Sequence, residues 1–346
     1  MSKEKISIQD IADSLGLSRN TVSKALNGSE KTPEVTRNKV VEKAIELKYK
    51  HFAFMNTENL IIKKTGNIAL LTCSMPTTSH FGSLLISGLE KKISAEGYNL
   101  SIHILREAEI DSLSFPNNFE LKNIDGIVCI ELFHKNYTKL VSSLGIPTIF
   151  IDSISDIIYP ELNADIILME NEHSTYLVTK KLIDNGCTSL GFVGDYNHCK
   201  SFNERWVGFN RALLDSNLKL DLSCCIVDDD NCPYGDYDWI KSKLDNMNNL
   251  PSAFICANDF IAVSLIKSLK NKNIKIPEQI LISGFDDSPE SRIVDPHLTT
   301  VHIFNSEMGG IAAEMLLSRL KSPSKPFQIT HVKTEPKFRD STGKII

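Results

Sequence analysis

The sequence predicts a small all-α head followed by a larger α/β body. In the first fifty residues, apolar side chains recur at helical spacing, and Gly, Ser and Thr separate the repeats. From about residue 67 onward, short apolar runs alternate with helical patterns, as in parallel sheets covered by helices. A chain of 346 residues, 42% of them hydrophobic, is long enough for two or three domains.

The first two helices of the head are marked by the residues at their ends. Ser7 and Asp10 form an S-x-x-D capping box, and Gly16 suits the left-handed turn that ends the first helix. Ser18 is expected to cap the second helix, which Asn27-Gly28 ends. The apolar faces of these two helices contain Ile8, Ile11, Ala12, Leu15, Val22, Ala25 and Leu26.

A third helix is predicted after Thr32, its cap, with Pro33 at its first position. The spacing of Ala12, Gly16 and Val22 is typical of a helix-turn-helix. The Ala allows close approach, the Gly makes the turn, and the Val packs the second helix onto the first. The pattern leaves open a small helical bundle without this role. The buried face of the third helix is expected to contain Val40, Val41, Ala44, Ile45 and Leu47.

The outer face of the second helix carries side chains that can read DNA. Arg can bond a guanine edge and Asn an adenine edge in the major groove, while Ser and Thr suit phosphates. Residues 1–64 contain 12 Lys/Arg against 8 Asp/Glu, a net charge of +4, and the remainder has 26 against 35, a net charge of −9. A solvated helical face would also explain this charge. The candidate DNA contacts in the head are Ser7, Ser18, Arg19, Asn20, Thr21, Ser23, Lys24, Asn27 and Thr36.

The body contains seven apolar runs of strand length, from "NIALLTC" to "ILISGF", separated by helical stretches such as 82–96, 171–185, 203–216 and 259–271. Ligands of parallel α/β sheets bind beyond the carboxyl ends of the strands. Three polar stretches follow strands in this way: Asp152, Asn258-Asp259 and Asp286-Asp287. Asp259 is expected to cap the helix that begins there.

Several classes of protein are disfavoured by the sequence. No apolar leader or membrane-spanning run is visible, so we expect a cytoplasmic protein without membrane contact. The eight cysteines form no CxxC pair and no metal-ligand spacing, which predicts reduced thiols and no metal or cofactor. A redox-active Cys224-Cys225 pair is the open alternative. No P-loop, G-x-G-x-x-G or G-x-S-x-G motif supports an enzyme.

The patterned residues resemble the LacI/GalR family of bacterial transcription regulators. The resemblance rests on "ISIQDIADSLGLSRNTVSKALNG" and "TPEVTRNKVVEKAIELKY" in the head, and on "SFNERWVGFNRALLDSN", "PSAFICANDF", "IPEQILISGFDD" and "KFRDSTG" in the body. It implies a helix-turn-helix head on a two-lobed, periplasmic-binding-protein-like effector domain. It also implies a homodimer that binds operator DNA, with an affinity set by a small effector, usually a sugar.

This resemblance also implies domain limits. Residues 1–50 would form the DNA-binding domain, residues 51–66 a linker, and residues 67–346 the effector-binding domain. Lobe N would contain about 67–165 and 300–322, and lobe C about 166–299 and 323–346. A tetramer is not expected, because the tail after "FRDSTG" has no heptad repeat.

The resemblance assigns effector contacts to six residues: Phe81, Asp152, Ser201, Arg205, Asn258 and Asp286. Arg205 could fork onto hydroxyls or a carboxylate, and Asp286 could accept from neighbouring hydroxyls. Local roles remain open as alternatives, namely a salt bridge for Arg205, capping or turn bonding for Asp152, Asn258 and Asp286, and packing for Phe81. An aromatic contact is also expected near 231–234, where Tyr234 is the candidate. The family's Asp-Asn pair reads Glu170-Asn171 here, so no ligand role is carried to Asn171.

The linker departs from the family pattern. The segment "YKHFAFMNTENLIIKKTGN" lacks the usual Pro and the Ala-Arg pair of a hinge helix. Leu60 is the best candidate for a wedge inserted into the minor groove, and it completes the set of predicted DNA contacts.

Three functions compete at this point. An effector-controlled regulator, which the resemblance implies to be a repressor, explains both the head and the body. A solute-binding protein would use the same body but needs an export signal and leaves the head unexplained. A sugar-processing enzyme would need catalytic partners for the carboxylates of "GFDDSPE", and none can be argued.

Overall fold

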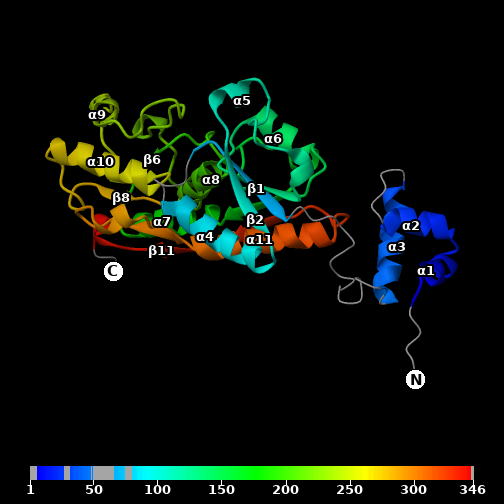
Figure 1. Cartoon of the computed structure of the whole chain (residues 1–346). Coiled ribbons are helices and arrows are strands. Elements are labelled where there is room, and N and C mark those ends of the chain that lie inside the picture. Colours follow the sequence, from blue (N-terminus) through cyan, green and yellow to red (C-terminus); the bar gives the residue numbers. More distant parts are fainter. Residues whose placement is uncertain (1–5, 27–31, 48, 50–65, 75–79, 344–346) are drawn as a thin grey trace. The chain divides into compact units, whose positions relative to one another are not determined.

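The computed structural model describes residues 6–26, 32–47, 49, 66–74 and 80–343 (Figure 1). The chain divides into two compact units, residues 1–65, here called the head, and residues 66–346, here called the body. Among the described residues, no helix is both long and apolar enough to cross a membrane.

The head confirms the predicted capping box at Ser7, the turn at Gly16 and the cap at Ser18. The backbone N–H of Ser7 donates to Asp10 Oδ2 at 2.7 Å, and the N–H of Asp10 donates to Ser7 Oγ at 3.4 Å. Gly16 has a left-handed φ of 65°, and Ser18 Oγ accepts from the N–H of Thr21 at 3.1 Å. The third helix begins directly after Pro33, one residue later than predicted. The helices are α1 (Ile8–Leu15), α2 (Arg19–Leu26) and α3 (Glu34–Glu46).

Small side chains allow the three helices to share one core. Ala12, Ala25 and Ala44 are buried together with larger apolar residues, as the helical spacing predicts. Asn27 and Leu60 lie outside the described residues, as do residues 51–65 of the predicted linker. The buried residues of the head are Ile11, Ala12, Val22, Ala25, Val40, Ala44 and Tyr49.

Lobe N is built on a parallel sheet with the strand order β10-β5-β4-β3-β1-β2. Side chains alternate across it, so that Ile68 and Leu70 pack against α4 and α11 while Ala69 and Leu71 face α6. The strands are β1 (Asn67–Thr72), β2 (Asn99–Ile104), β3 (Gly126–Ile130), β4 (Thr148–Ile151), β5 (Asp165–Met169) and β10 (Ile329–Val332). The helices are α4 (His80–Ala95), α5 (Glu107–Asp111), α6 (Lys135–Ser142) and α11 (Asn305–Lys321), with short turns η3 (Leu121–Asn123) and η4 (Tyr159–Glu161).

Lobe C is built on the parallel sheet β6-β7-β8, which helices cover on both faces. The strands are β6 (Leu190–Val193), β7 (Ala253–Cys256) and β8 (Leu281–Ser283). The helices are α7 (Glu172–Asp184), α8 (Lys200–Asp215), α9 (Tyr237–Asp245) and α10 (Asp259–Asn271). Short turns are η5 (Leu222–Cys224), η6 (Pro289–Arg292) and η7 (Asp340–Thr342). An antiparallel pair, β9 (Thr300–Ile303) and β11 (Thr334–Lys337), runs between the lobes.

The lobe boundaries fall later in the chain than the sequence indicates. The apolar run of β5 pairs with β4 and β10, so lobe N extends to Met169, a few residues past the expected limit of about 165. The strand β10 also belongs to lobe N, although residues 323–346 were expected in lobe C. Sequence periodicity did not separate these strands from crossover segments, because each is only four or five residues long.

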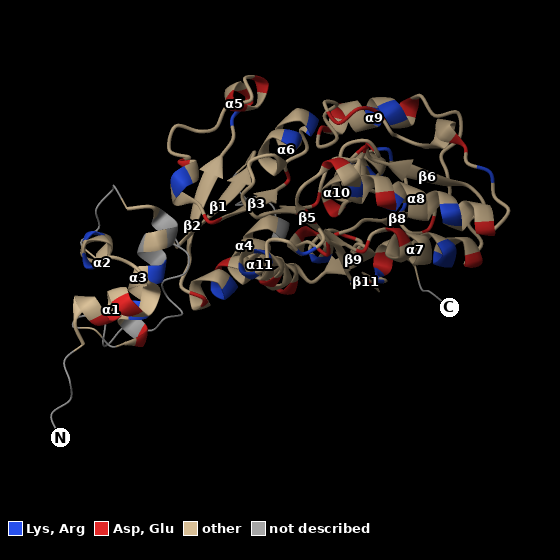
Figure 2. Ribbon diagram, turned by 90° about the vertical axis from the view of Figure 1, so that its right-hand side faces the viewer, with Lys and Arg blue, Asp and Glu red and all other residues tan. Residues whose placement is uncertain are grey.

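The closest helix contact in lobe N involves two glycines. The helices α4 and α11 lie side by side (Figure 1 and Figure 2). A Cβ on Gly88 would lie 1.9 Å from the carbonyl oxygen of Ser306, and a Cβ on Gly309 would lie 2.0 Å from that of Leu85. The backbones can meet only because neither position carries a side chain.

Candidate functional site

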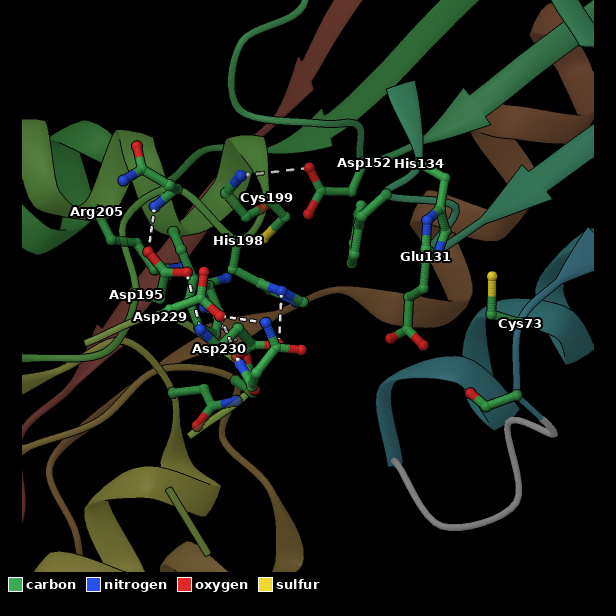
Figure 3. Close-up of a pocket in the computed structure, with 18 of the residues that line it drawn as sticks. Cys73, Glu131, His134, Asp152, Asp195, His198, Cys199, Arg205, Asp229 and Asp230 are labelled. Atoms are coloured by element: carbon green, nitrogen blue, oxygen red, sulfur yellow. Dashed lines mark hydrogen bonds and ion pairs between the residues drawn. The ribbon is translucent and has the colours of Figure 1, made fainter. Parts of the chain in front are cut away.

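A cavity of about 640 Å³ lies between the lobes, beyond the carboxyl ends of the strands (Figure 3). Lobe N contributes residues that follow β1, β3 and β4, and lobe C contributes residues that follow β6, β7 and β8 together with the first turns of α8. This is the place where open parallel sheets bind ligands. Five of the six predicted effector contacts line this cavity: Asp152, Ser201, Arg205, Asn258 and Asp286.

Phe81 is the sixth predicted contact. It lies in the first turn of α4 rather than in the loop that precedes the helix, and its side chain lies outside the described part of the chain. Tyr234 does not line the cavity. It is 5% exposed, its hydroxyl donates to the carbonyl of Asp228 at 2.6 Å, and Asn231 lines the cavity in its neighbourhood. The expected aromatic contact near 231–234 is therefore not provided by Tyr234.

Arg205 is held rigidly at the base of the cavity. Its side chain is buried, its Nε donates to Asn171 Oδ1 at 3.0 Å, and one terminal nitrogen donates to the carbonyl of Ala257 at 2.6 Å. Its guanidinium lies 3.7 Å from the ring centre of Phe285 and 3.6 Å from an Asp286 oxygen. The sequence analysis assigned no ligand role to Asn171. In the structure, Asn171 positions Arg205 through this hydrogen bond.

Asp152 joins the two lobes. Its Oδ1 accepts from the N–H of Ser153 at 2.7 Å and from the N–H of Ser201, across the cavity, at 3.2 Å. The N–H of Lys200 also donates to the carbonyl of Ser153 at 2.7 Å, and Ser155 Oγ donates to the carbonyl of Asn197 at 2.6 Å. Burial raises the pKa of Asp152, and hydrogen bonds at the loop oppose that effect.

The helix cap at the start of α10 is not the one predicted. Asn258 Oδ1 accepts from the N–H of Ile261 at 2.9 Å, so Asn258 caps the helix while also lining the cavity. Asp259 is buried instead and accepts from Thr300 Oγ1 at 2.6 Å and from the N–H of Ser288 at 2.8 Å. The prediction for Asp259 is wrong, because the preceding residue has the extended backbone that a cap requires.

Several cavity residues were missed. Glu131 directly follows β3 and Asp195 follows β6 by one glycine, so the rule that identified Asp152 would also have found both. The loops after β3, β6 and η5 supply the rest, and the spacing of these loop residues gives no comparable signal. The missed residues include Glu131, Phe133, His134, Asp195, Asn197, His198, Asp229, Asp230 and Asn231. Among the described residues, no His, Cys, Asp and Glu cluster has the arrangement of a metal site.

Asp287, next to Asp286, anchors the C-terminal segment to lobe C. Its side chain pairs with Arg292 at 2.6 Å, with Arg339, and with His302 at 2.9 Å. Burial opposes ionisation of Asp287, but the two guanidinium groups outweigh it and lower the pKa of this carboxyl.

A lowered native pKa makes stability depend on pH in a defined direction. The stabilisation by Asp287 is present above the unfolded pKa of about 3.9 and is lost as the pH falls through the native pKa. We expect Asp287→Asn to lower the free energy of unfolding by about 2 kcal/mol at pH 7. Urea unfolding between pH 7 and pH 3 should show a smaller acid-dependent loss in the variant than in the parent. Equal losses would contradict this account.

The second helix of the head presents the predicted DNA-contact side chains to solvent. Ser18, Arg19, Asn20 and Lys24 are exposed, and Thr21 and Ser23 are half-buried. Ser7 is exposed and Thr36 is half-buried. The hydroxyls of Ser18 and Thr21 lie 2.8 Å apart, so the helix start holds both oxygens in place.

A helix-turn-helix head and a two-lobed body with a polar cavity define a DNA-binding regulator with a ligand-sensing domain. Residues 7–51 match the model of the bacterial regulatory proteins of the lacI family, and residues 179–342 match a periplasmic binding protein-like domain. With these two matches in one chain, the protein is similar to the LacI family of bacterial regulatory proteins in both its head and its body.

The matches to similar proteins cover nearly the whole chain. The HTH-type transcriptional repressor PurR of Vibrio vulnificus (strain CMCP6) is 28% identical over 342 residues, which cover 98% of this chain and 99% of that protein. A complex of the transcriptional regulator CelR with cellobiose has a TM-score of 0.70 at 20% identity and covers 97% of this chain and 99% of its own. The lac repressor dimer bound to operator and the anti-inducer ONPF has a TM-score of 0.66 at 18% identity, with coverages of 99% and 100%. These structures share the fold of this chain.

Proposed function

We propose that this chain is a cytoplasmic repressor that binds operator DNA as a homodimer, under the control of a sugar-like effector held between the lobes. The observation that carries the proposal is the cavity at the strand ends. It brings a buried guanidinium together with carboxylate, amide and hydroxyl groups, a set that suits a hydroxylated ligand. The protein would need no catalytic step.

The comparisons support the same function. The CelR structure contains cellobiose, and the lac repressor structure is a dimer on its operator. In this chain, the six predicted effector contacts would bind the effector, while the exposed face of α2 would enter the major groove. Leu60, outside the described residues, would insert into the minor groove. Effector and operator would then change each other's affinity by the same factor.

The test is fluorescence anisotropy of the full chain on its own upstream intergenic DNA, across a salt series, with and without a panel of sugars. Sequence-selective binding that one sugar alters would support both halves of the proposal. Selective binding that no sugar alters would keep the regulator and reject the sugar. Absence of selective binding would reject the operator assignment for that DNA.

The recognition helix can be tested by one substitution. Arg19→Ala should weaken binding to the selected operator by about 10- to 100-fold, because a bidentate base contact contributes about 1–3 kcal/mol of discrimination. Lys43→Ala removes the same charge from α3, where Lys43 is already paired with Glu46 at 2.8 Å. This control should change affinity by less than about threefold. Equal losses of operator affinity in both variants would mean that Arg19 contributes only its positive charge and no base contact.

A further inference from the structure

The cavity between the lobes is strongly acidic. Its carboxylates are Glu131, Asp152, Asp195, Asp229, Asp230 and Asp286. Among its described lining residues, Arg205 is the single Lys or Arg side chain, and two histidines also line it. An anionic ligand such as a sugar phosphate or a sugar acid would be repelled by this field, whereas a cationic ligand would be attracted.

The positive charge of Arg205 is already engaged within the protein. Its nitrogens donate to Asn171 and Ala257, and its charge lies 3.6 Å from an oxygen of Asp286. His198 is likewise held by Asp230, with 2.9 Å between its Nδ1 and the carboxylate. Both pairs belong to lobe C. The charges of Arg205 and His198 also act on Asp152 and Glu131, but no described Lys, Arg or His forms an ion pair with either of these lobe N carboxylates.

Glu131 is the carboxylate on that side with the most freedom to bind. It directly follows β3, is half-buried, and has neither a hydrogen bond nor an ion pair with any described residue. Figure 3 shows its carboxylate pointing into the space between the lobes, on the opposite side from Arg205. Burial, followed by the charge of Asp152, raises the pKa of Glu131 and outweighs the opposing charge of His198, so a closer cation would further stabilise the ionised form.

The remaining walls suit a hydroxylated ring. Asn197, Asn231 and Asn258 offer amides that can both donate to and accept from hydroxyls. Phe133 from lobe N and Phe202 from lobe C lie 4.9 Å and 5.3 Å from the His198 ring, so aromatic surface faces the cavity from both lobes. Such aromatic surface can pack against the apolar face of a sugar.

We propose that the ligand of this cavity is an amino sugar with a free, protonated amine, and that Glu131 is the counter-ion of that amine. The proposal rests on the proposed function, because it names the class of effector that would occupy the same cavity. The hydroxyls of the sugar would bond to the amides and to the lobe C groups around Arg205. A neutral sugar would leave the charge of Glu131 uncompensated when the cavity loses its water.

The test is isothermal titration calorimetry on the full chain without DNA, using matched sugars. The amino members are D-glucosamine, D-galactosamine and D-mannosamine, the neutral members are the parent hexoses, and N-acetyl-D-glucosamine keeps the nitrogen without its charge. We expect at least one amino sugar to bind at least about tenfold more tightly than its parent hexose and its acetylated form.

Two variants assign the effect to Glu131. Glu131→Gln keeps the size of the side chain and removes its charge, so it should weaken amino-sugar binding by about tenfold and change neutral-sugar binding by less than about threefold. Glu278→Gln makes the same change at an exposed residue that does not line the cavity, and it should have no effect. Thermal unfolding of both variants checks that the fold is kept.

Three results would overturn the proposal. They are equal or tighter binding of the neutral sugar, no binding by any of the three amino sugars, and an unchanged preference in Glu131→Gln. The proposed function fails in a different way, because operator binding is measured separately. Amino-sugar binding without an effect on operator affinity would keep the ligand class and reject the regulation.

Discussion

Gly309→Ala should destabilise the body by about 3 kcal/mol, at the upper end of the usual range for overpacking. The new methyl would lie 2.0 Å from the backbone oxygen of Leu85 and 2.8 Å from the backbone nitrogen of Leu89. Neither atom can move away independently, because both belong to α4, which packs along the length of α11. The two helices would have to separate, and the core of lobe N beneath them would lose contacts.

The neighbouring glycine provides the matched control. Gly310 lies in the same turn of α11, and a Cβ there would meet no atom within 4 Å. Gly310→Ala should therefore stabilise the body by about 0.5–1 kcal/mol, because Ala loses less backbone entropy in a helix. Urea unfolding followed by circular dichroism measures both changes. A midpoint for Gly309→Ala at or above that of Gly310→Ala would disprove the described packing.

The second large effect is expected at Arg205. Arg205→Met keeps much of the volume but leaves Asn171 Oδ1, the Ala257 carbonyl and Asp286 without their partner. Removing one member of a buried charge pair costs about 3–5 kcal/mol, and we expect the lower value because Asp286 is partly exposed. The variant should also lose at least about 100-fold in affinity for any ligand that the parent binds.

Tryptophan fluorescence is a suitable probe, because Trp206 and Trp239 are the two tryptophans of the chain and both lie in lobe C. Arg211→Met is the control: it changes an arginine on the same helix whose side chain is 55% exposed and paired with Glu172. Its effect on the unfolding free energy should stay below about 1 kcal/mol. If both variants unfold at the same denaturant concentration, the contacts of Arg205 do not stabilise the lobe.

The predictable parts of this molecule are those where one local rule decides the outcome. The capping box at Ser7, the turn at Gly16 and the seven apolar strands follow from local patterns, and the structure confirms them. The gathering of Asp152, Arg205 and Asp286 into one cavity also follows, because parallel strands end at the same edge of a sheet.

Other features depend on tertiary contacts that a linear pattern does not contain. The role of Asn171 arises from a bond to Arg205, 34 positions away in the chain. The N-cap of α10 is Asn258 rather than the predicted Asp259, because Thr300 and Ser288 hold Asp259 in the core. The assignment of β5 and β10 to lobe N depends on the pairing of these two strands, whose partner residues are 163 positions apart, and periodicity cannot show such a pairing.

Three carboxylates of the cavity lie on left-handed backbone. The φ angles are 52° at Glu131, 62° at Asp152 and 114° at Asp286. Few L-residues adopt such angles easily, and Gly, Asn and Asp do so best. The evolutionary consequence is that few residue types are tolerated at these positions. Exchange of Asp for Asn there changes the charge without reshaping the loop. Related sensors that diverge in ligand would therefore differ here more readily in charge than in backbone shape.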